Sequence, residues 1–303
     1  MKKVFITGGT GFLGRNLVDR LSNHYKLTVL TRKLPHTNEY SNVEYILGDL
    51  LSENLENLIK GHDVVIHLAG LVNYSIQTFP EMYSLNVEGT VRLCEICKKE
   101  NIKKFVFAST YNTEAYFSGE KKVDLGHIGY IKTKKMAEQA ISQLLNDSKT
   151  HFDIIRPSSI YGPGFFDHYS RKSMKDLVFK KSIWLCPPGG INIVSLEAVL
   201  ESFETSLKNL ECTYIKNVTG INMTYKKLLY EFRERINRSV LIVAVPRWPL
   251  KCFVRIARTI KLDKILKSFE LDLIEITLYN NFSSEKLTTK HSLKEIIDEA
   301  FSE

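Results

Sequence analysis

The sequence predicts an α/β fold, in which a doubly wound parallel sheet is followed by a smaller, mainly helical C-terminal lobe. In the first half, short apolar runs alternate with amphipathic helical patterns, as expected when helices connect parallel strands. Beyond Gly162 the pattern becomes irregular, and prolines and glycines mark loops. The 303 residues are 44% hydrophobic and 25% charged, which suits a globular protein large enough for both parts.

Six strands and three helices are expected in the first half. The strands span 3–7, 27–31, 44–47, 63–68, 104–109 and 153–156, and the helices span 15–23, 87–100 and 130–146. A strand and helix over 191–207 and a strand over 213–218 predict a return to the sheet. We therefore expect a main domain over 1–165 with returns near 191–218, and a lobe built from 166–190 and 219–303.

A glycine-rich segment follows the first expected strand and opens the first helix, with the sequence Thr7-Gly8-Gly9-Thr10-Gly11-Phe12-Leu13-Gly14. In such a loop Gly8 permits a tight turn, Gly11 lets the backbone approach a pyrophosphate, and Gly14 allows close packing of helix and strand. The helix N-terminus then offers free N–H groups and a positive dipole end to the anion. This pattern predicts a Rossmann dinucleotide site, with Phe12 and Leu13 among its contacts.

The second strand ends at Thr31 and is followed by Arg32 and Lys33. An acidic residue there would bind the ribose hydroxyls of NAD, whereas cations suit the 2′-phosphate of NADP. We therefore prefer NADP and keep NAD as the alternative. After the third strand, Asp49 can accept a hydrogen bond from adenine, with Leu50 beside it; it can also cap the next helix, and both roles can hold at once.

Tyr130 and Lys134 are four residues apart, so on a helix they share one face. A neighbouring ammonium favours the phenolate and lowers the pKa of a tyrosine. Tyr130 could then exchange a proton with a substrate oxygen while a nicotinamide exchanges a hydride. Ser109 and Thr110, at the end of the fifth strand, provide a hydroxyl to hold that oxygen. Together these residues predict hydride-transfer chemistry.

The chain resembles the extended short-chain dehydrogenase/reductases, which include the NAD-dependent epimerase/dehydratase family. Six ordered motifs within about residues 1 to 165 carry the resemblance. They are the glycine loop Thr7–Gly14, the fourth-strand segment Asp63-Val64-Val65-Ile66-His67-Leu68-Ala69-Gly70, the helix segment Asn86-Val87-Glu88-Gly89-Thr90, the fifth-strand segment Phe105-Val106-Phe107-Ala108-Ser109-Thr110, the active-site helix from Tyr130 to Lys134 with Ala137-Glu138, and the segment from Arg156-Pro157 to Tyr161-Gly162-Pro163-Gly164.

The resemblance implies roles for particular residues. Thr110 takes the place of the usual catalytic serine, Tyr130 is the acid/base, and Lys134 binds the nicotinamide ribose. It also implies that a cofactor trough is lined by Leu68, Ala69 and Gly70 and that Pro157 flanks the nicotinamide. Threonine in place of serine departs from the family pattern but keeps a hydroxyl.

Three functions remain open. The first is an NAD(P)-dependent oxidoreductase acting on a carbonyl or secondary alcohol of a small molecule. The second is a nucleotide-sugar epimerase or dehydratase with tightly bound NAD, and the third is a non-catalytic dinucleotide-binding scaffold or redox sensor. Nucleotide-sugar members tend to have an Arg-Asp pair where this chain has Gly189-Gly190-Ile191-Asn192. This difference and Arg32 favour the dihydroflavonol-reductase and 3-beta-hydroxysteroid-dehydrogenase-like branch.

The segment 247–267 is a basic amphipathic pattern, with cations every three or four residues and apolar residues between them. It can lie on an anionic membrane surface, cap a substrate pocket, or be an ordinary lobe helix with its charged face in water. The family resemblance implies a homodimer formed through the helices near 87–100 and 134–146.

Several classes are disfavoured. A net charge of +8 is mild and does not indicate a nucleic-acid partner. Five scattered cysteines argue against a disulfide framework, and the Cys94/Cys97 pair is expected to be buried rather than metal-binding or redox-active. The eight histidines lack ligand spacing, so no metal site is expected. With no apparent signal peptide or spanning segment, we expect a cytoplasmic protein, with peripheral contact to the inner membrane face as an option.

Overall fold

The structure is a computed structural model that describes most of the chain. It covers 1–37, 40–72, 79–113, 128–167, 171–260, 262, 271–279, 282 and 290–302, together with the backbone of 116–118 and 121–123. All site residues predicted from the sequence lie within these ranges. The expected basic segment 247–267 is described to residue 260 and at Leu262, and the rest of it lies outside the described residues.

A seven-stranded sheet forms the centre of the molecule, in the order β12-β8-β5-β4-β1-β2-β3, and every neighbouring pair is parallel. The strands are β1 (Lys3–Thr7), β2 (Lys26–Thr31), β3 (Val43–Leu47), β4 (Val64–His67), β5 (Lys104–Ala108), β8 (His151–Pro157) and β12 (Tyr214–Val218). Strand order reverses between β1 and β4, and ligands of such sheets bind at the carboxyl ends beside this reversal. The predicted fold class and the six early strands are confirmed.

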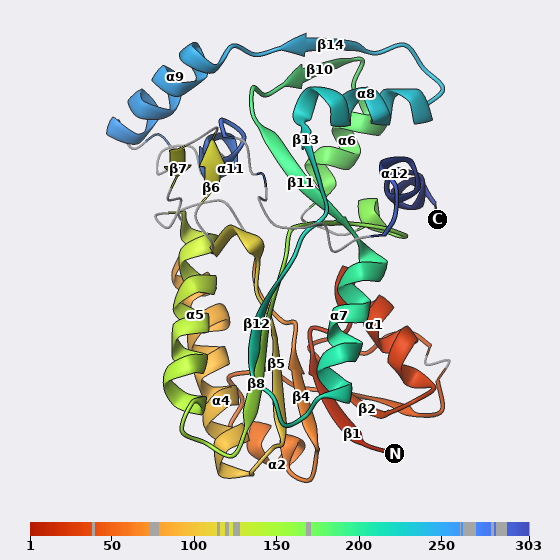
Figure 1. Cartoon of the computed structure of the whole chain (residues 1–303), viewed down its shortest axis with the longest axis vertical. Coiled ribbons are helices and arrows are strands. Elements are labelled where there is room, and N and C mark those ends of the chain that lie inside the picture. The colour runs from red at the N-terminus through yellow and green to blue at the C-terminus, as the bar shows by residue number, and fades with distance from the viewer. Residues whose placement is uncertain are drawn as a thin grey trace.

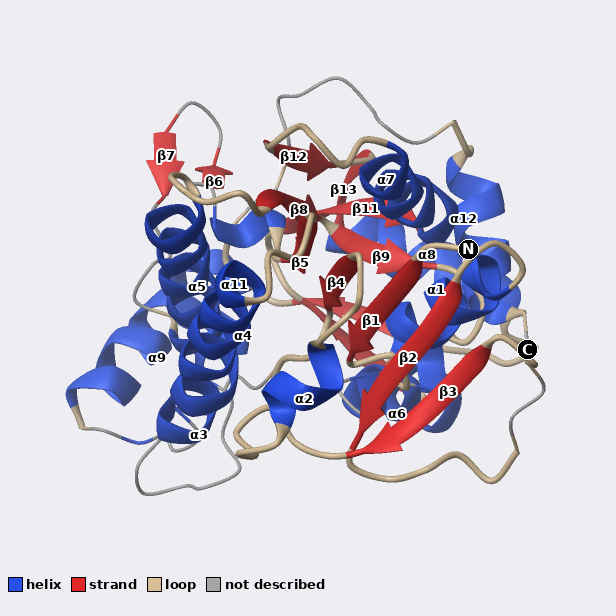
Figure 2. Ribbon diagram, turned by 90° about the horizontal axis from the view of Figure 1, so that it is seen from below, coloured by secondary structure: helices blue, strands red, loops and turns tan. Residues whose placement is uncertain are grey.

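Helices cover both faces of this sheet (Figures 1 and 2). One face carries α1 (Phe12–Ser22) and α7 (Leu196–Lys208), and the other carries α2 (Leu55–Ile59), α4 (Gly89–Lys99) and α5 (Gly129–Leu145). Alternate residues of one strand therefore enter different cores: Val4 and Ile6 pack with α1 and α7, whereas Phe5 packs on the other side. Burial on both faces explains why the central strands β1, β4 and β5 are rich in apolar residues.

Short elements connect these layers. They are α3 (Phe79–Tyr83), the π-helix η2 (Ser84–Glu88), the 3₁₀ helices η3 (Tyr111–Thr113) and η4 (Phe165–Asp167), and the hairpin strands β6 (Tyr116–Ser118) and β7 (Lys121–Val123). The helix expected over 87–100 is thus a π-turn that continues into α4.

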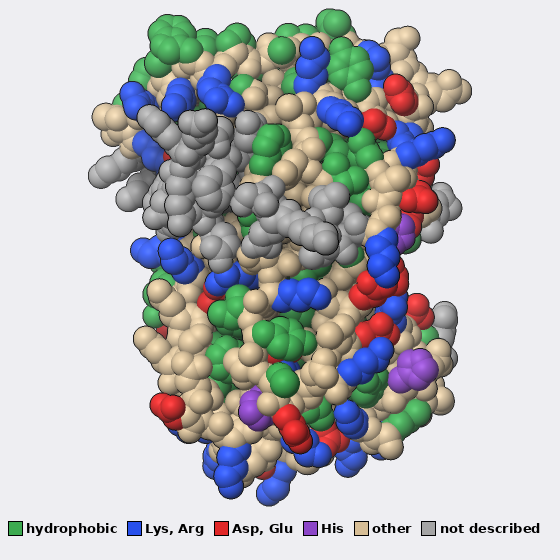
Figure 3. Space-filling model, viewed as in Figure 1, with side chains coloured by type: hydrophobic (Ala, Val, Ile, Leu, Met, Phe, Trp, Pro, Cys, Tyr) green, Lys and Arg blue, Asp and Glu red, His purple; other side chains and the backbone are tan. Residues whose placement is uncertain are grey.

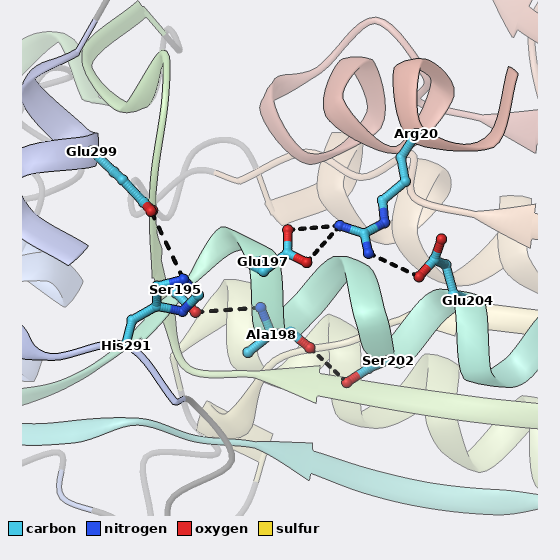
Figure 4. A network of polar contacts seen from close by, with 8 residues as sticks. All are labelled: Arg20, Ser195, Glu197, Ala198, Ser202, Glu204, His291 and Glu299. Atoms are coloured by element: carbon cyan, nitrogen blue, oxygen red, sulfur yellow. Dashed lines mark hydrogen bonds and ion pairs between the residues drawn. The ribbon is translucent and has the colours of Figure 1, made fainter. Parts of the chain in front are cut away.

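Arg20 joins the helix after the glycine loop to α7 (Figure 4). Its guanidinium lies 2.6 Å from a Glu197 oxygen and 3.0 Å from a Glu204 oxygen. The Ser195 hydroxyl caps α7 by accepting the Ala198 N–H at 3.3 Å. Two partly buried carboxylates on one guanidinium fix α1 and α7 to each other.

The lobe has its own core above the carboxyl edge of the sheet. Its strands are β9 (Ser159–Tyr161), β10 (Ile183–Cys186), β11 (Gly190–Ser195), β13 (Ile221–Thr224) and β14 (Leu241–Ala244). Its helices are α6 (Lys172–Lys180), α8 (Tyr225–Arg235), α9 (Arg247–Thr259), α11 (Leu271–Ile276) and α12 (Leu293–Phe301). The lobe is mainly helical, as predicted.

One strand prediction was wrong. The strand expected over 191–194 does not return to the main sheet, because β11 pairs with β9 and β13 in a separate three-stranded sheet. The place beside β8 is taken by β12, so only α7 and β12 return as expected.

All five cysteines are free thiols, and Cys94 and Cys97 are buried on α4. Burial raises the pKa of both thiols, which keeps them protonated and unreactive. The expectation of buried helix cysteines is confirmed. Among the described residues, no helix combines the length and apolar character needed to cross a bilayer, and no cluster of metal-ligating side chains occurs.

Candidate functional site

The glycine loop between β1 and α1 packs tightly against its surroundings. Gly8 has a φ of +73°, and a Cβ on it would lie 2.5 Å from the Ala69 backbone nitrogen. A Cβ on Gly14 would lie 2.1 Å from the Gly8 carbonyl oxygen. Both glycines are therefore required by the fold itself, through a left-handed turn and a close contact of helix with loop.

Gly11 is different. A Cβ there would meet only the Gly8 oxygen, at 3.4 Å, so the fold leaves room for a side chain. Gly11 is also the N-cap residue of α1, and no side chain caps this helix. An open position beside an uncapped helix N-terminus suits an anionic phosphate. The loop geometry therefore fits the predicted dinucleotide, while Phe12 and Leu13 pack partly into the core.

The end of β4 lies directly against this loop. Leu68, Ala69 and Gly70 follow the strand, and the Ala69 N–H donates to the Thr7 hydroxyl at 3.4 Å. A Cβ on Gly70 would lie 3.2 Å from Lys134 Nζ. The predicted trough residues thus connect the glycine loop to Lys134 of α5.

His67, the last residue of β4, fixes the base of this trough. Its Nδ1 lies 2.7 Å from the Thr7 hydroxyl and its Nε2 lies 3.0 Å from the Thr90 hydroxyl. Thr90 donates its own proton to the Asn86 carbonyl, so Nε2 is the protonated nitrogen and Nδ1 accepts from Thr7. Burial, together with the charge of Lys134, lowers the pKa of His67 to about 3, so the ring is neutral.

Tyr130 and Lys134 lie one turn apart near the start of α5, and both are buried. Lys134 Nζ donates to the Ala108 carbonyl at 2.8 Å and lies 4.5 Å from the centre of the Phe107 ring. Burial lowers the pKa of Lys134 to about 8, and the charge of Glu138 partly opposes this. The ammonium therefore remains the main form at neutral pH, held at the carboxyl end of β5 beside the trough.

Tyr130 belongs to an apolar cluster. Its ring packs among side chains from α3, from the end of β4, from α5 and from α11, namely Leu71, Val72, Phe79, Met82, Ile128, Ile131, Ile276 and Tyr279. Such a setting excludes water and strengthens the effect of a nearby charge on the phenol.

The two hydroxyls at the end of β5 have different partners. Ser109 is buried and donates to the Glu138 carboxylate, which also accepts from Thr113 at 3.1 Å and from Arg156 Nε at 2.9 Å. The Thr110 hydroxyl is only partly buried and accepts the Asn112 N–H at 3.3 Å. Ser109 is thus committed to an internal network, and Thr110 is the more accessible hydroxyl.

Asn86 is a structural residue of the site that residue-level reasoning missed. Its side chain accepts the Leu71 N–H at 2.7 Å and donates to the Leu71 carbonyl at 3.0 Å and the Thr133 hydroxyl at 3.1 Å. It therefore ties the segment after β4 to α5. The asparagine within an otherwise helical family motif was the sequence feature that could have indicated this structural role, because buried polar side chains need hydrogen-bond partners.

The predicted adenosine-side residues lie at the ends of β2 and β3. Arg32 and Lys33 are exposed. The Asp49 carboxylate accepts the Leu51 N–H at 2.9 Å, and α2 has Asn54 as its N-cap, so the alternative of a helix cap was wrong. Leu50 is buried in the core, which leaves its side chain little surface for a ligand.

Pro157 ends β8, and the next residue, Ser158, donates its N–H to the Val218 carbonyl of β12 at 3.0 Å. The lobe contacts the start of α5 through α11. There Asp272 is buried and accepts the N–H of Gly129, the first residue of α5, at 3.3 Å. Asp272 was not predicted, because sequence alone does not place residue 272 beside residue 129.

Comparisons with known proteins agree with this geometry. A family model described as the NAD dependent epimerase/dehydratase family matches residues 4–180. UDP-glucose 4-epimerase of Vibrio cholerae is 25% identical over 291 residues, covering 90% of this chain and 88% of the relative. The decarboxylating sterol-4-alpha-carboxylate 3-dehydrogenase of Candida albicans is 27% identical over 186 residues, which span 54% of this chain and only 52% of that relative.

Solved structures support the fold. MoeE5 in complex with UDP-glucuronic acid and NAD superposes with a TM-score of 0.70 at 23% identity, covering 80% of this chain and 85% of the other. UDP-glucuronic acid 4-epimerase from Bacillus cereus in complex with NAD gives 0.69 at 20% identity, covering 80% and 86%. The family predicted from the motifs is confirmed: the chain belongs to the NAD-dependent epimerase/dehydratase family.

Proposed function

We propose that the protein is an NAD(P)-dependent oxidoreductase that interconverts a carbonyl and a secondary alcohol on a small molecule. The proposal rests on one observation. A continuous line of contacts runs from Gly8 to Ala69, from Gly70 to Lys134, and on to Ala108, one residue before the Ser109-Thr110 pair. The phosphate loop and the Tyr130/Lys134 helix therefore face the same edge of the sheet.

The dinucleotide would be held by the glycine loop, by the Leu68–Gly70 segment and by Lys134, and its nicotinamide would supply or accept a hydride. Thr110 binds the substrate oxygen, and Tyr130 gives that oxygen a proton or removes one. The Lys134 ammonium favours the ionised phenol, and the apolar cluster around Tyr130 keeps water away.

Tyr130→Phe tests this proposal. It removes the hydroxyl and retains the ring, so we expect turnover of an identified carbonyl substrate to fall about 10²- to 10⁴-fold with cofactor binding retained. The measurement is steady-state kinetics with a parallel cofactor titration. Tyr230→Phe, on the exposed part of α8, is the matched control and should leave turnover unchanged. Full activity of Tyr130→Phe would refute the mechanism.

A second function, nucleotide-sugar epimerisation, is favoured by the near full-length match to UDP-glucose 4-epimerase. In that case the cofactor is restored in each cycle. Purified protein would then retain NAD and interconvert sugars without net reduction, whereas a reductase would consume NAD(P)H stoichiometrically. If the protein bound the cofactor but showed neither activity, the result would support the third function, a non-catalytic dinucleotide-binding scaffold or redox sensor.

The finer predictions stay open. Arg32 and Lys33 support NADP, whereas the family description names NAD. The homodimer through α4 and α5 also stays a prediction. A cytoplasmic location likewise stays a prediction.

A further inference from the structure

The end of the lobe farthest from the sheet has an exposed apolar surface, which we call the apical face (Figures 1 and 3). Strands β10 and β14 and helix α9 form it. Its members, with their exposed fractions, are Ile183 (59%), Leu185 (63%), Leu241 (60%), Val243 (39%), Trp248 (76%), Phe253 (39%), Ile256 (61%) and Ile260 (53%). Isolated exposed side chains are ordinary, but eight on three adjoining elements need an explanation.

The strand part of this face follows from register. β10 and β14 are parallel, and Ile183 is opposite Leu241 while Leu185 is opposite Val243. Alternate residues point the other way: Trp184 and Cys186 are buried in the lobe core, and Ile242 packs against it. The pair is therefore apolar on both faces, whereas a strand pair with one face in water normally has polar residues there.

The helix part has the same character. Val254 and Ala257 bury the inner face of α9, while Trp248 and Ile256 are on the outer side. Arg247, Lys251 and Arg255 are exposed beside them. The apolar surface is thus flanked by cations along the whole helix.

The segment that contains β14 and α9 is basic. From Arg238 to Leu262 the chain has six basic residues and no acidic one. Arg258 is the member of the set on α9 that is neutralised, by Asp272 and Glu275 of α11 at 2.7 and 2.5 Å. The exposed cations therefore lack acidic neighbours in their own segment.

We propose that the apical face docks on an anionic lipid bilayer. Apolar side chains enter the interface and flanking cations meet lipid phosphates and carboxylates, as in other interfacial helices. The surface is wider than the basic segment 247–267 alone, because β10 and β14 extend it. A second copy of the chain suits the face poorly, since a two-fold interface would bring like charges together.

The two tryptophans provide a direct assay. Trp248 is 76% exposed and Trp184 is fully buried, so a change in emission on docking reports Trp248. We expect binding and a blue shift with phosphatidylcholine vesicles containing about 30% phosphatidylserine, little binding to phosphatidylcholine alone, and weakening by salt. Brominated lipid should quench the shifted emission. Absence of binding to the anionic vesicles would overturn the proposal.

Two double variants distinguish vesicle binding by the apical face from nonspecific binding by other surfaces. Arg255→Glu with Ile256→Ser should weaken partitioning about a hundredfold, because a charge is reversed and a buried apolar group is lost. Lys26→Glu with Ile215→Ser makes the same kinds of change at exposed positions of the main sheet and should bind as wild type. Equal loss in both variants would overturn the proposal.

Sedimentation equilibrium tests the alternative that a second copy of the chain covers the apical face. The proposal expects that Arg255→Glu with Ile256→Ser leaves the oligomeric state unchanged. If the wild type is a dimer that does not bind the vesicles, and this variant is a monomer, the apical face is a subunit interface instead. Thermal unfolding confirms that each variant is folded.

Discussion

Ser109 and Thr110 are adjacent at the end of β5, but they differ in what they can do. Ser109 is bound to buried Glu138, whereas the Thr110 hydroxyl is at a partly open position. We expect Thr110→Ala to lower kcat about 10²-fold and Thr110→Ser to restore most of it, because serine keeps the hydroxyl. Ser109→Ala should mainly lower the Tm, by leaving a buried carboxylate short of a donor. Kinetics and thermal unfolding of the three variants check this.

The opposite outcome is informative. If Ser109→Ala abolished turnover with an unchanged Tm while Thr110→Ala remained active, Ser109 would be the substrate-binding hydroxyl. The Glu138 network would then have to open during the reaction.

His67 predicts how stability depends on pH. Its pKa is lowered from 6.5 to about 3 in the fold, so the unfolded chain binds a proton more readily. Stability is therefore unaffected by this group above pH 6.5 and falls as pH decreases toward 3, by roughly 5 kcal/mol at full effect. His67→Asn should flatten this part of the unfolding free energy curve. Urea titrations at several pH values provide the measurement.

Exposed His24 is the matched control, because His24→Asn should leave the acid slope as in wild type. Equal slopes for wild type and His67→Asn would mean that His67 is protonated in the fold, contrary to its hydrogen bonds.

The positions of the candidate catalytic residues were easier to predict from the sequence than the residues that support them. Tyr130, Lys134 and Thr110 stand in motifs with local spacing, and the structure places all three at one edge of the sheet. From the sequence, Glu138 and Asn86 could be identified only as members of family motifs, with no role assigned to them. Their importance comes from hydrogen bonds to segments remote in sequence, which no local pattern encodes.

At the scale of elements, two glycines of the loop have different expected roles: Gly14 is needed for folding, and Gly11 is expected to be needed for cofactor binding. Gly14→Ala would force a Cβ to 2.1 Å from the Gly8 oxygen, so we expect a loss of several kcal/mol or failure to fold. Gly11→Ala has room in the free protein and should unfold near the wild-type Tm, yet bind NAD(P) at least about tenfold more weakly because the methyl occupies the phosphate position. Calorimetry and cofactor titration distinguish the two effects.

Unchanged cofactor affinity in Gly11→Ala would mean that the phosphate lies elsewhere. Unchanged stability in Gly14→Ala would mean that α1 can shift away from the loop.

The central strands of the main sheet were predicted well because burial on both faces makes them apolar runs. The choice of partner was not predictable for β11. Its apolar pattern suits any sheet, and only the whole chain decides that β12 lies beside β8 while β11 joins β9 and β13.

At the scale of the molecule, the lobe contacts the start of α5. Asp272 of α11 accepts from Gly129 of α5 and pairs with Arg258 of α9. Asp272→Asn removes a negative charge near the start of α5. Loss of this charge should favour the ionised form of the Tyr130 phenol. We expect the tyrosine-dependent limb of the kcat profile to move to lower pH, with a modest fall in Tm. A pH-rate series measures this.

Asp298→Asn, at a half-exposed ion pair with Arg235, is the control and should keep the wild-type profile. A shift in neither variant would show that the lobe contributes packing at this point and no charge.

The family model ends at Lys180, but the chain cannot be cut there without damage. A truncated fragment would lose α7, whose Leu196, Val199 and Phe203 fill one core, and β12, which covers the edge of β8. It would present a bare strand and an uncovered apolar surface, both of which promote aggregation. Recombinant production of the nucleotide-binding half therefore requires internal excision of the lobe, with the segment from Ser195 to Val218 grafted back.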